Sequence, residues 1–190
     1  MRSRLAWLAA ALSAFSLLSA CQQEEAPVNK ASLPPVAAPP YICDYVPLDA
    51  VRLMTGVHDP IVRGRFNMST SDDGGSGGCF VYQPTGNKLK VLDVTLSPGG
   101  SQKEAEFQIS QGAQRLPEIV PGSVGYYGQD SSAGNTQAAA TLVRGDDLLI
   151  VELVRGVKGR DNAADVVALM KLVAPKLILN VTPSPNKAKG

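Results

Sequence analysis

A serine among glycines and a lone histidine are the residues of this sequence whose types could support nucleophilic catalysis. Ser76 lies at the centre of Gly74-Gly75-Ser76-Gly77-Gly78, which fits the Gly-x-Ser-x-Gly string of a nucleophile elbow. That elbow needs a strand before the serine and a helix after it, whereas an acidic loop precedes Ser76 and a strand is expected to follow. His58 is the one histidine, and beside Asp59 it is typical of a surface pair. We therefore predict no catalytic residue, and a hydrolase using Ser76 and His58 is the least favoured hypothesis.

Two pairs of aspartates are the best clusters of possible metal ligands. Asp72-Asp73 and Asp146-Asp147 could contact a calcium ion, but neither has the alternating oxygen ligands of a dedicated calcium loop. Both pairs lie beside glycine, which is typical of turns. A single histidine leaves no cluster for zinc. We predict neither a metal site nor a bound cofactor.

Cys43 and Cys79 are two of the three cysteines. In an oxidising compartment, for which the N-terminus gives the evidence below, such a pair is most simply a disulfide, here joining the start of the first expected helix to the start of the first expected strand. The chain-entropy model gives such a bond about 3.8 kcal/mol of stabilisation. A redox-active pair is the alternative, but the Cys-x-x-Cys spacing is missing. We predict a structural disulfide.

The N-terminus has the layout of an export signal. Arg2 and Arg4 precede an uncharged apolar run over residues 5–18, which is shorter than the about 20 residues that span a bilayer. Leu18-Ser19-Ala20-Cys21 resembles a bacterial lipobox, in which a peptidase cuts before the cysteine and its sulfur carries a diacylglyceryl group. Ordinary secretory cleavage, which would leave Cys21 as a free thiol, is the alternative. The resemblance implies a palmitate-type lipid anchor on Cys21, at the extracytoplasmic face of the cell membrane.

The charge balance excludes one class of partner. The chain has 18 basic and 17 acidic residues, and loss of Arg2 and Arg4 with the signal leaves 16 basic ones. A near-neutral chain without a basic stripe is not expected to bind nucleic acid. The membrane, reached through the lipid on Cys21, is the partner that the sequence predicts. The compartment is expected to be oxidising.

Composition divides the chain into four parts. We predict a signal peptide over residues 1–20, a proline-rich tether over 21–41, a folded domain over 42–179 and a disordered tail over 180–190. The tether composition cannot bury a core and favours extended conformations, with a reach of about 60 Å. A proline-rich ligand for another protein is the alternative interpretation of this segment.

The folded part alternates between helical and strand periodicity. Leu92, Val94 and Leu96 are expected on the buried face of a strand, and Ser101 with Glu104 forms a capping box. Consecutive strands joined by short turns pair antiparallel, so we predict an α+β domain. It has one antiparallel sheet of about five strands, helices packed on one face of the sheet, and one disulfide. Helices are expected over 47–55, 101–111 and 163–177, and strands over 79–83, 88–96, 125–129, 137–143 and 148–154.

Several short motifs carry a resemblance to a known family: Cys43-Asp44-Tyr45 before Pro47, a helix ending at Gly56, a glycine-rich loop into Cys79-Phe80-Val81-Tyr82, and Val120-Pro121-Gly122. Over most of residues 42–179 this pattern resembles small actinobacterial cell-envelope lipoproteins that form a domain of unknown function. Val46 departs from the family, which usually has Thr or Ser as the cap at this place. The resemblance implies the lipid anchor, the disulfide and the α+β fold, and it implies no reaction.

Two functional hypotheses follow. The first is a binding or assembly module in the cell envelope, which holds an envelope protein or a small apolar ligand near the membrane. The second is an accessory or sensory subunit of a membrane complex. It predicts an exposed patch near Tyr126, Tyr127 and the glycine-rich loop.

Overall fold

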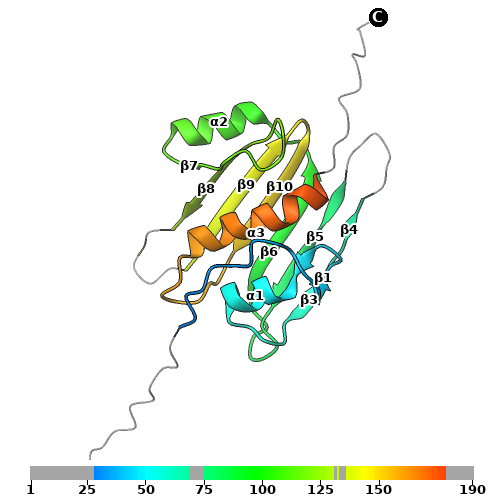
Figure 1. The fold of residues 1–190 in the computed structure, drawn as a ribbon, viewed down its shortest axis with the longest axis vertical. Helices are drawn as coiled ribbons and strands as arrows, with labels where there is room; N and C mark the ends of the chain where they lie inside the picture. The colour runs from blue at the N-terminus through cyan, green and yellow to red at the C-terminus, as the bar shows by residue number, and fades with distance from the viewer. Residues whose placement is uncertain (1–27, 69–74, 131, 133–135, 179–190) are drawn as a thin grey trace, which may run out of the picture.

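The computed structural model describes residues 28–68, 75–130, 132 and 136–178. The predicted signal peptide, Cys21, the first part of the tether, the Asp72-Asp73 pair and the C-terminal tail lie outside these residues. At the centre of the described chain is an eight-stranded antiparallel sheet (Figure 1). None of the helices in the described part has the length and apolar character that a bilayer-spanning helix requires.

The strands of the sheet follow the order β3-β5-β6-β10-β9-β8-β7, and β4 pairs with β5 beside β3. Their bounds are β3 (Ile61–Arg63), β4 (Phe66–Asn67), β5 (Ser76–Tyr82), β6 (Lys90–Pro98), β7 (Gln114–Arg115), β8 (Val124–Gln129), β9 (Ala138–Arg144) and β10 (Asp147–Leu153). A separate ribbon pairs β1 (Tyr41–Ile42) with β2 (Val46–Pro47). The helices are α1 (Leu48–Thr55), α2 (Gln102–Ser110) and α3 (Asn162–Leu177).

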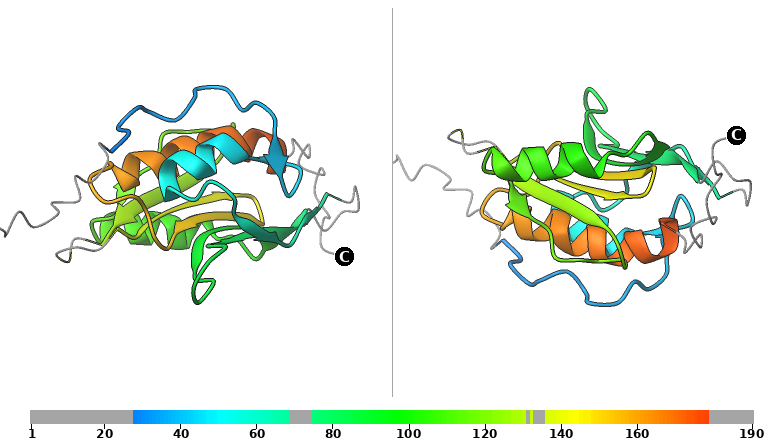
Figure 2. Two further views of the ribbon diagram at one scale, coloured as in Figure 1. Left: turned by 90° about the horizontal axis from the view of Figure 1, so that it is seen from below. Right: turned by 90° about the horizontal axis from the view of Figure 1, so that it is seen from above.

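The main core lies between the sheet and the layer formed by α1 and α3 (Figure 2). Leu92, Val94 and Leu96 of β6 are at most 2% exposed, which confirms the predicted buried face of this strand. In α3, Asp161 caps the N-terminus by accepting a hydrogen bond from the N–H of Ala164, and most of the helix is buried. The predicted α+β class, the antiparallel sheet and the helix positions are therefore confirmed.

The second helix differs from the expectation that all helices pack on one face. Figure 2 shows α2 on the opposite face of the sheet from α1 and α3. Val143, which faces away from Leu142 on β9, is 2% exposed but is not part of the main core. The apolar stripe of α2 is too narrow for a place in the main core beside α1 and α3, because Ala105 is its one buried residue and Phe107 is 54% exposed. Such a helix can cover only a small part of a sheet.

The sheet also has more strands than the five expected. The additional strands β3, β4 and β7 contain two or three residues each, too few for an alternating pattern to be recognised in the sequence. They extend the sheet at its two edges, where each pairs with a longer strand.

The predicted disulfide is present. Cys43 and Cys79 are joined, with their Cα atoms 5.7 Å apart. Cys79 lies in β5 and is completely buried, whereas Cys43 lies between β1 and β2. The bond therefore fastens the small N-terminal ribbon to the large sheet.

Residues 28–40 pack against the domain, although the sequence predicts a free tether there. We name this segment the strap; it runs along the outer side of the α1 and α3 layer (Figure 2). Leu33 is 5% exposed and belongs to the main core. Near the end of the strap, the Tyr41 hydroxyl donates to the carbonyl oxygen of Ala37 at 2.9 Å. The first residues in contact with the domain thus lie before the predicted boundary at residue 42.

A buried arginine holds the start of the strap. The Arg160 guanidinium donates to the carbonyl oxygens of Asn29 and Ala31, the latter at 3.0 Å. It also makes two hydrogen bonds to the Asp165 carboxylate, at 2.8 and 2.7 Å, and the two side chains are 3% and 6% exposed. These bonds to Asp165 raise the pKa of Arg160. The strap is therefore attached through a fixed, charged and almost fully buried side chain.

Gly125 of β8 provides a test of how closely the sheet is packed. A Cβ atom at this position would lie 2.5 Å from the carbonyl oxygen of Thr141 and 2.8 Å from a methyl group of Leu116. Because a backbone oxygen cannot move aside easily, we expect Gly125→Ala to lower the free energy of unfolding by about 1–3 kcal/mol. Gly128→Ala on the same strand is the control, since nothing lies within 4 Å of its added Cβ. Urea unfolding of both variants measures the difference, and equal stabilities would contradict this packing.

Candidate functional site

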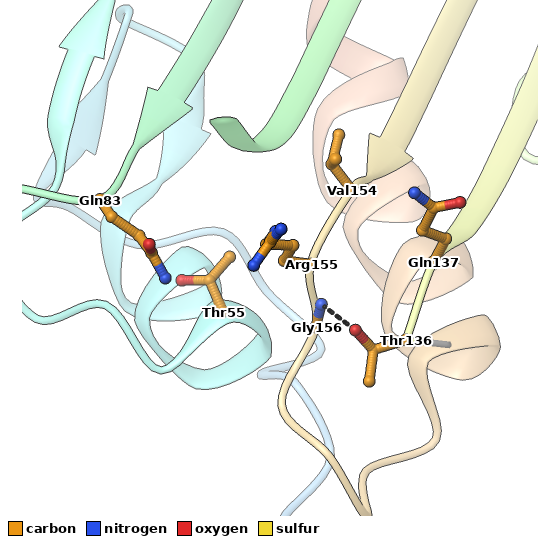
Figure 3. Close-up of a pocket in the computed structure, with 7 residues that line it drawn as sticks. All are labelled: Thr55, Gln83, Thr136, Gln137, Val154, Arg155 and Gly156. Atoms are coloured by element: carbon orange, nitrogen blue, oxygen red, sulfur yellow. Dashed lines mark hydrogen bonds between the residues drawn. The ribbon is translucent and has the colours of Figure 1, made fainter. Parts of the chain in front are cut away.

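A polar pocket opens at one end of the sheet, where β5, β10 and α1 end and β9 begins. It has a volume of about 460 Å³ (Figure 3). The Arg155 side chain extends into the middle of this region, between Thr55 and Gln83 on one side and Gln137 on the other (Figure 3). We call it the Arg155 pocket. Its lining residues are Thr55, Gln83, Thr136, Gln137, Val154, Arg155 and Gly156.

Backbone hydrogen bonds fix the loop that carries Arg155. After β10 ends, the N–H groups of Val154 and Arg155 both donate to the carbonyl oxygen of Val91 on the neighbouring strand, at 2.9 and 3.1 Å. Gly156 N–H donates to the Thr136 hydroxyl at 3.2 Å (Figure 3). One residue later, Val157 N–H donates to a carbonyl oxygen at the end of α1. The loop is thereby connected to three neighbouring segments, and the backbone at Arg155 is held in place.

The pocket carries a positive charge, and no described residue of its lining neutralises this charge. No carboxylate lines it, and within the described residues the exposed Arg155 guanidinium has neither an ion pair nor a side-chain hydrogen bond. Gln83 contributes an amide that can donate hydrogen bonds. A guanidinium forms paired hydrogen bonds to carboxylate or phosphate groups. The chemistry of the pocket therefore suits an anionic group on a ligand better than an apolar one.

The structure does not bring Ser76 and His58 together. Ser76 begins β5 and pairs with Asn67, whereas His58 lies in the loop that leads to Ile61, which pairs with Tyr82 at the other end of β5. The two positions are thus separated by roughly 20 Å, the length of the strand. Ser76 also lies within a strand rather than at a strand-to-helix turn. This arrangement does not provide a nucleophile with a general base.

The predicted turn at Asp146-Asp147 is present between β9 and β10, at the end of the sheet far from the Arg155 pocket. Burial raises the pKa of the Asp147 carboxyl, an effect that Arg144 opposes and Asp146 reinforces. No group of three or more possible metal ligands occurs among the residues that the structure describes. The turn therefore offers two carboxylates and no further side-chain ligand.

The patch expected for an accessory subunit is not contiguous. Tyr126 and Tyr127 are neighbours on β8 and point to opposite faces of the sheet, whereas the described part of the glycine-rich loop, Gly75 to Gly78, lies at the start of β5. Strands β6, β10 and β9 lie between β5 and β8. Adjacent strands are about 4.8 Å apart, so the two parts of the expected patch are separated by roughly 19 Å.

The face of the sheet that α1 and α3 leave open carries a pair of acidic residues. Asp93 of β6 lies directly opposite Glu152 of β10, and like charges at such positions repel. Lys90 compensates for part of this repulsion through a 2.7 Å bond to Asp93. The same hydrogen bond is the main cause of the raised pKa of Lys90. We interpret the group as a local charge balance within the sheet.

Comparison with known proteins does not assign a function to this pocket. No protein-family model matches the sequence, and no curated protein matches it at a significant level. The resemblance to actinobacterial lipoproteins stays a prediction.

The sequence did not predict the Arg155 pocket, because threonines, glutamines and one arginine from distant segments form no motif. The available signal was a charged residue and a glycine directly after the predicted strand 148–154.

Proposed function

We propose that the protein is a membrane-anchored extracytoplasmic lipoprotein that acts as a binding module in the cell envelope. In this proposal the lipid on Cys21 attaches the chain to the membrane, and the Arg155 pocket holds an anionic group of an envelope component. The observation that carries the binding role is the Arg155 guanidinium, which among the described residues has no ion-pair partner and no carboxylate in its pocket lining. The Cys43–Cys79 disulfide supports an oxidising location.

The pocket changes the expected ligand. A small apolar molecule, one of the ligands that the sequence suggests, would leave the guanidinium of Arg155 without a partner in the bound state. A phosphate or carboxylate would form charge-assisted hydrogen bonds with it. We therefore propose an anionic ligand, either free or as part of an envelope polymer or protein.

Binding of small anions tests the proposed site. Titration of the purified protein with inorganic phosphate, glycerol 3-phosphate or acetate is expected to shift the NMR signals of Gln83 and Arg155. Arg155→Gln is expected to weaken this binding by about tenfold or more, in line with the loss of a charge-assisted hydrogen bond. Lys158→Gln is the matched control, because it removes the same charge from the same loop outside the pocket lining. Equal affinity in the two variants would contradict the site.

The anchor is tested in the same set of proteins. Fractionation of native cells is expected to find the wild type, Arg155→Gln and Lys158→Gln in the membrane fraction. Cys21→Ala is expected in the soluble extracytoplasmic fraction, because one or more acyl chains account for membrane attachment. Crosslinking before fractionation then shows whether a captured partner depends on Arg155. A membrane-bound Cys21→Ala protein would contradict lipid anchoring.

A further inference from the structure

We propose that the strap fixes the orientation of the domain on the membrane, so that the Arg155 pocket and the loop between β10 and α3 face the lipid headgroups. This inference rests on the proposed lipid anchor at Cys21. Its partner is a lipid surface, and its contact surface is the pocket end of the domain. The alternative is a free tether, on which the domain would turn in any direction.

The strap is attached to the domain by specific hydrogen bonds and by a buried side chain. Arg160 is held by the Asp165 carboxylate and donates to two carbonyl groups of the strap, those of Asn29 and Ala31, which are two positions apart. Two residues farther on, Leu33 is 5% exposed and packs in the main core. Arg160 thus acts as a polar clamp and Leu33 as an apolar anchor, and together they hold residues 29–33 of the strap. Such a segment does not behave as a solvated linker.

The position of the clamp places the start of the strap beside the pocket. Arg160 belongs to the same loop as Arg155, and a Cβ atom on Gly159 would lie 4.0 Å from a methyl group of Val28. Cys21 and Val28 are seven positions apart in the sequence, a separation that a fully extended chain spans with at most roughly 25 Å. A tether that is free as far as residue 41 would instead reach about 60 Å. The pocket end is therefore kept close to the lipid.

The opposite end of the sheet must then point away from the membrane. β10 runs from Asp147 to Leu153, so the turn at Asp146 lies roughly 20 Å farther along the sheet than the pocket. The charges favour the same orientation for an anionic membrane. At the pocket end the exposed basic residues Lys30, Arg155 and Lys158 outnumber the exposed acidic residues Asp130 and Asp161, whereas the far turn carries Asp146-Asp147 with Arg144 beside it.

Fluorescence transfer in vesicles tests the orientation. The full-length lipidated protein is reconstituted into vesicles of phosphatidylcholine with a minority of phosphatidylglycerol and a headgroup-linked acceptor dye. A donor dye is attached at Lys158→Cys or at Asp146→Cys, both exposed positions. We expect transfer from position 158 to exceed transfer from position 146 by about twofold, because the two sites lie roughly 20 Å apart along the sheet. Equal transfer from both positions would overturn the inference.

Variants of the strap show whether it causes the orientation. Leu33→Ala removes the apolar anchor and keeps the Arg160–Asp165 pair, so we expect the difference between the two labels to become smaller. Val36→Ala is the matched control, because this strap residue is 73% exposed and its truncation should preserve the difference. If Leu33→Ala and Val36→Ala behave alike in vesicles, the strap does not set the orientation.

A second measurement follows the strap without a membrane. Cleavage by trypsin after Lys30 requires the segment between the two clamped carbonyl groups to leave Arg160. We expect this cleavage to be about tenfold faster in Leu33→Ala than in the wild type or Val36→Ala. Equal rates would overturn the docking of the strap. Failure of the lipidated protein to remain with the vesicles would overturn the anchor, and with it the orientation, and this outcome is distinct from equal transfer in a bound protein.

Discussion

Replacing Cys43 and Cys79 together by alanine is expected to lower the free energy of unfolding by about 3.8 kcal/mol. The disulfide closes a loop between residues 36 positions apart, and in the chain-entropy model its loss gives that loop back its freedom in the unfolded chain. The loss is a large fraction of the about 5–15 kcal/mol that stabilises an ordinary domain. Urea unfolding of the wild type and the double variant measures it.

Reduction of the wild-type protein is the control for this substitution. The reduced wild type and the double alanine variant should have similar stabilities, because both lack the loop closure while only the variant lacks the two sulfur atoms. Since Cys79 is completely buried, the variant should be slightly the less stable of the two. A change below about 1 kcal/mol on reduction would contradict this prediction, because closing the loop would then cost the unfolded chain little entropy.

The second large effect is expected at Asp165. Its side chain is 6% exposed and forms two hydrogen bonds with Arg160, which is 3% exposed. Asp165→Ala leaves a buried guanidinium without a counter-ion, so we expect the free energy of unfolding to fall by about 3–5 kcal/mol. Urea unfolding measures the loss. Trypsin cleavage after Lys30 should become faster in the same variant, because the clamp on the strap loses its support.

A double-mutant cycle separates the ion pair from its surroundings. The combined variant Arg160→Leu and Asp165→Ala removes both charges, so it should be more stable than Asp165→Ala alone. It should still release the strap, because the carbonyl groups of Asn29 and Ala31 lose their donor. Strictly additive effects of the two substitutions would contradict a direct coupling between Arg160 and Asp165.

Local patterns predicted the central elements of the fold well. The alternation of Leu92, Val94 and Leu96 identified the buried face of β6, and Gly56 ends α1 in the left-handed conformation expected of a C-cap. The Ser101 hydroxyl caps α2 by accepting from Glu104 N–H, but the Glu104 carboxylate accepts from Gln108 and does not complete the capping box. These features depend on residues close together in the chain, which is why the sequence reveals them.

The docking of the strap could not be predicted from local sequence patterns. Prolines and alanines predict a solvated, extended segment, and the strap is indeed irregular. Its contacts depend on Arg160, which lies 131 positions after Asn29 and 129 after Ala31. A contact at this separation leaves no periodic signal. The Arg155 pocket was missed for a similar reason, because Thr55, Gln83 and Thr136 come together only through the order of the strands.

The dependence of the strap on α3 also determines when it can dock during synthesis. The strap is among the first segments to be made, whereas Arg160 and α3 are the last structured parts of the described chain. A growing chain that has not yet reached Arg160 has no donor for the carbonyl groups of Asn29 and Ala31. The N-terminal segment must therefore remain undocked until nearly the whole domain has emerged. Closure of the strap therefore marks a chain that has been completed as far as α3.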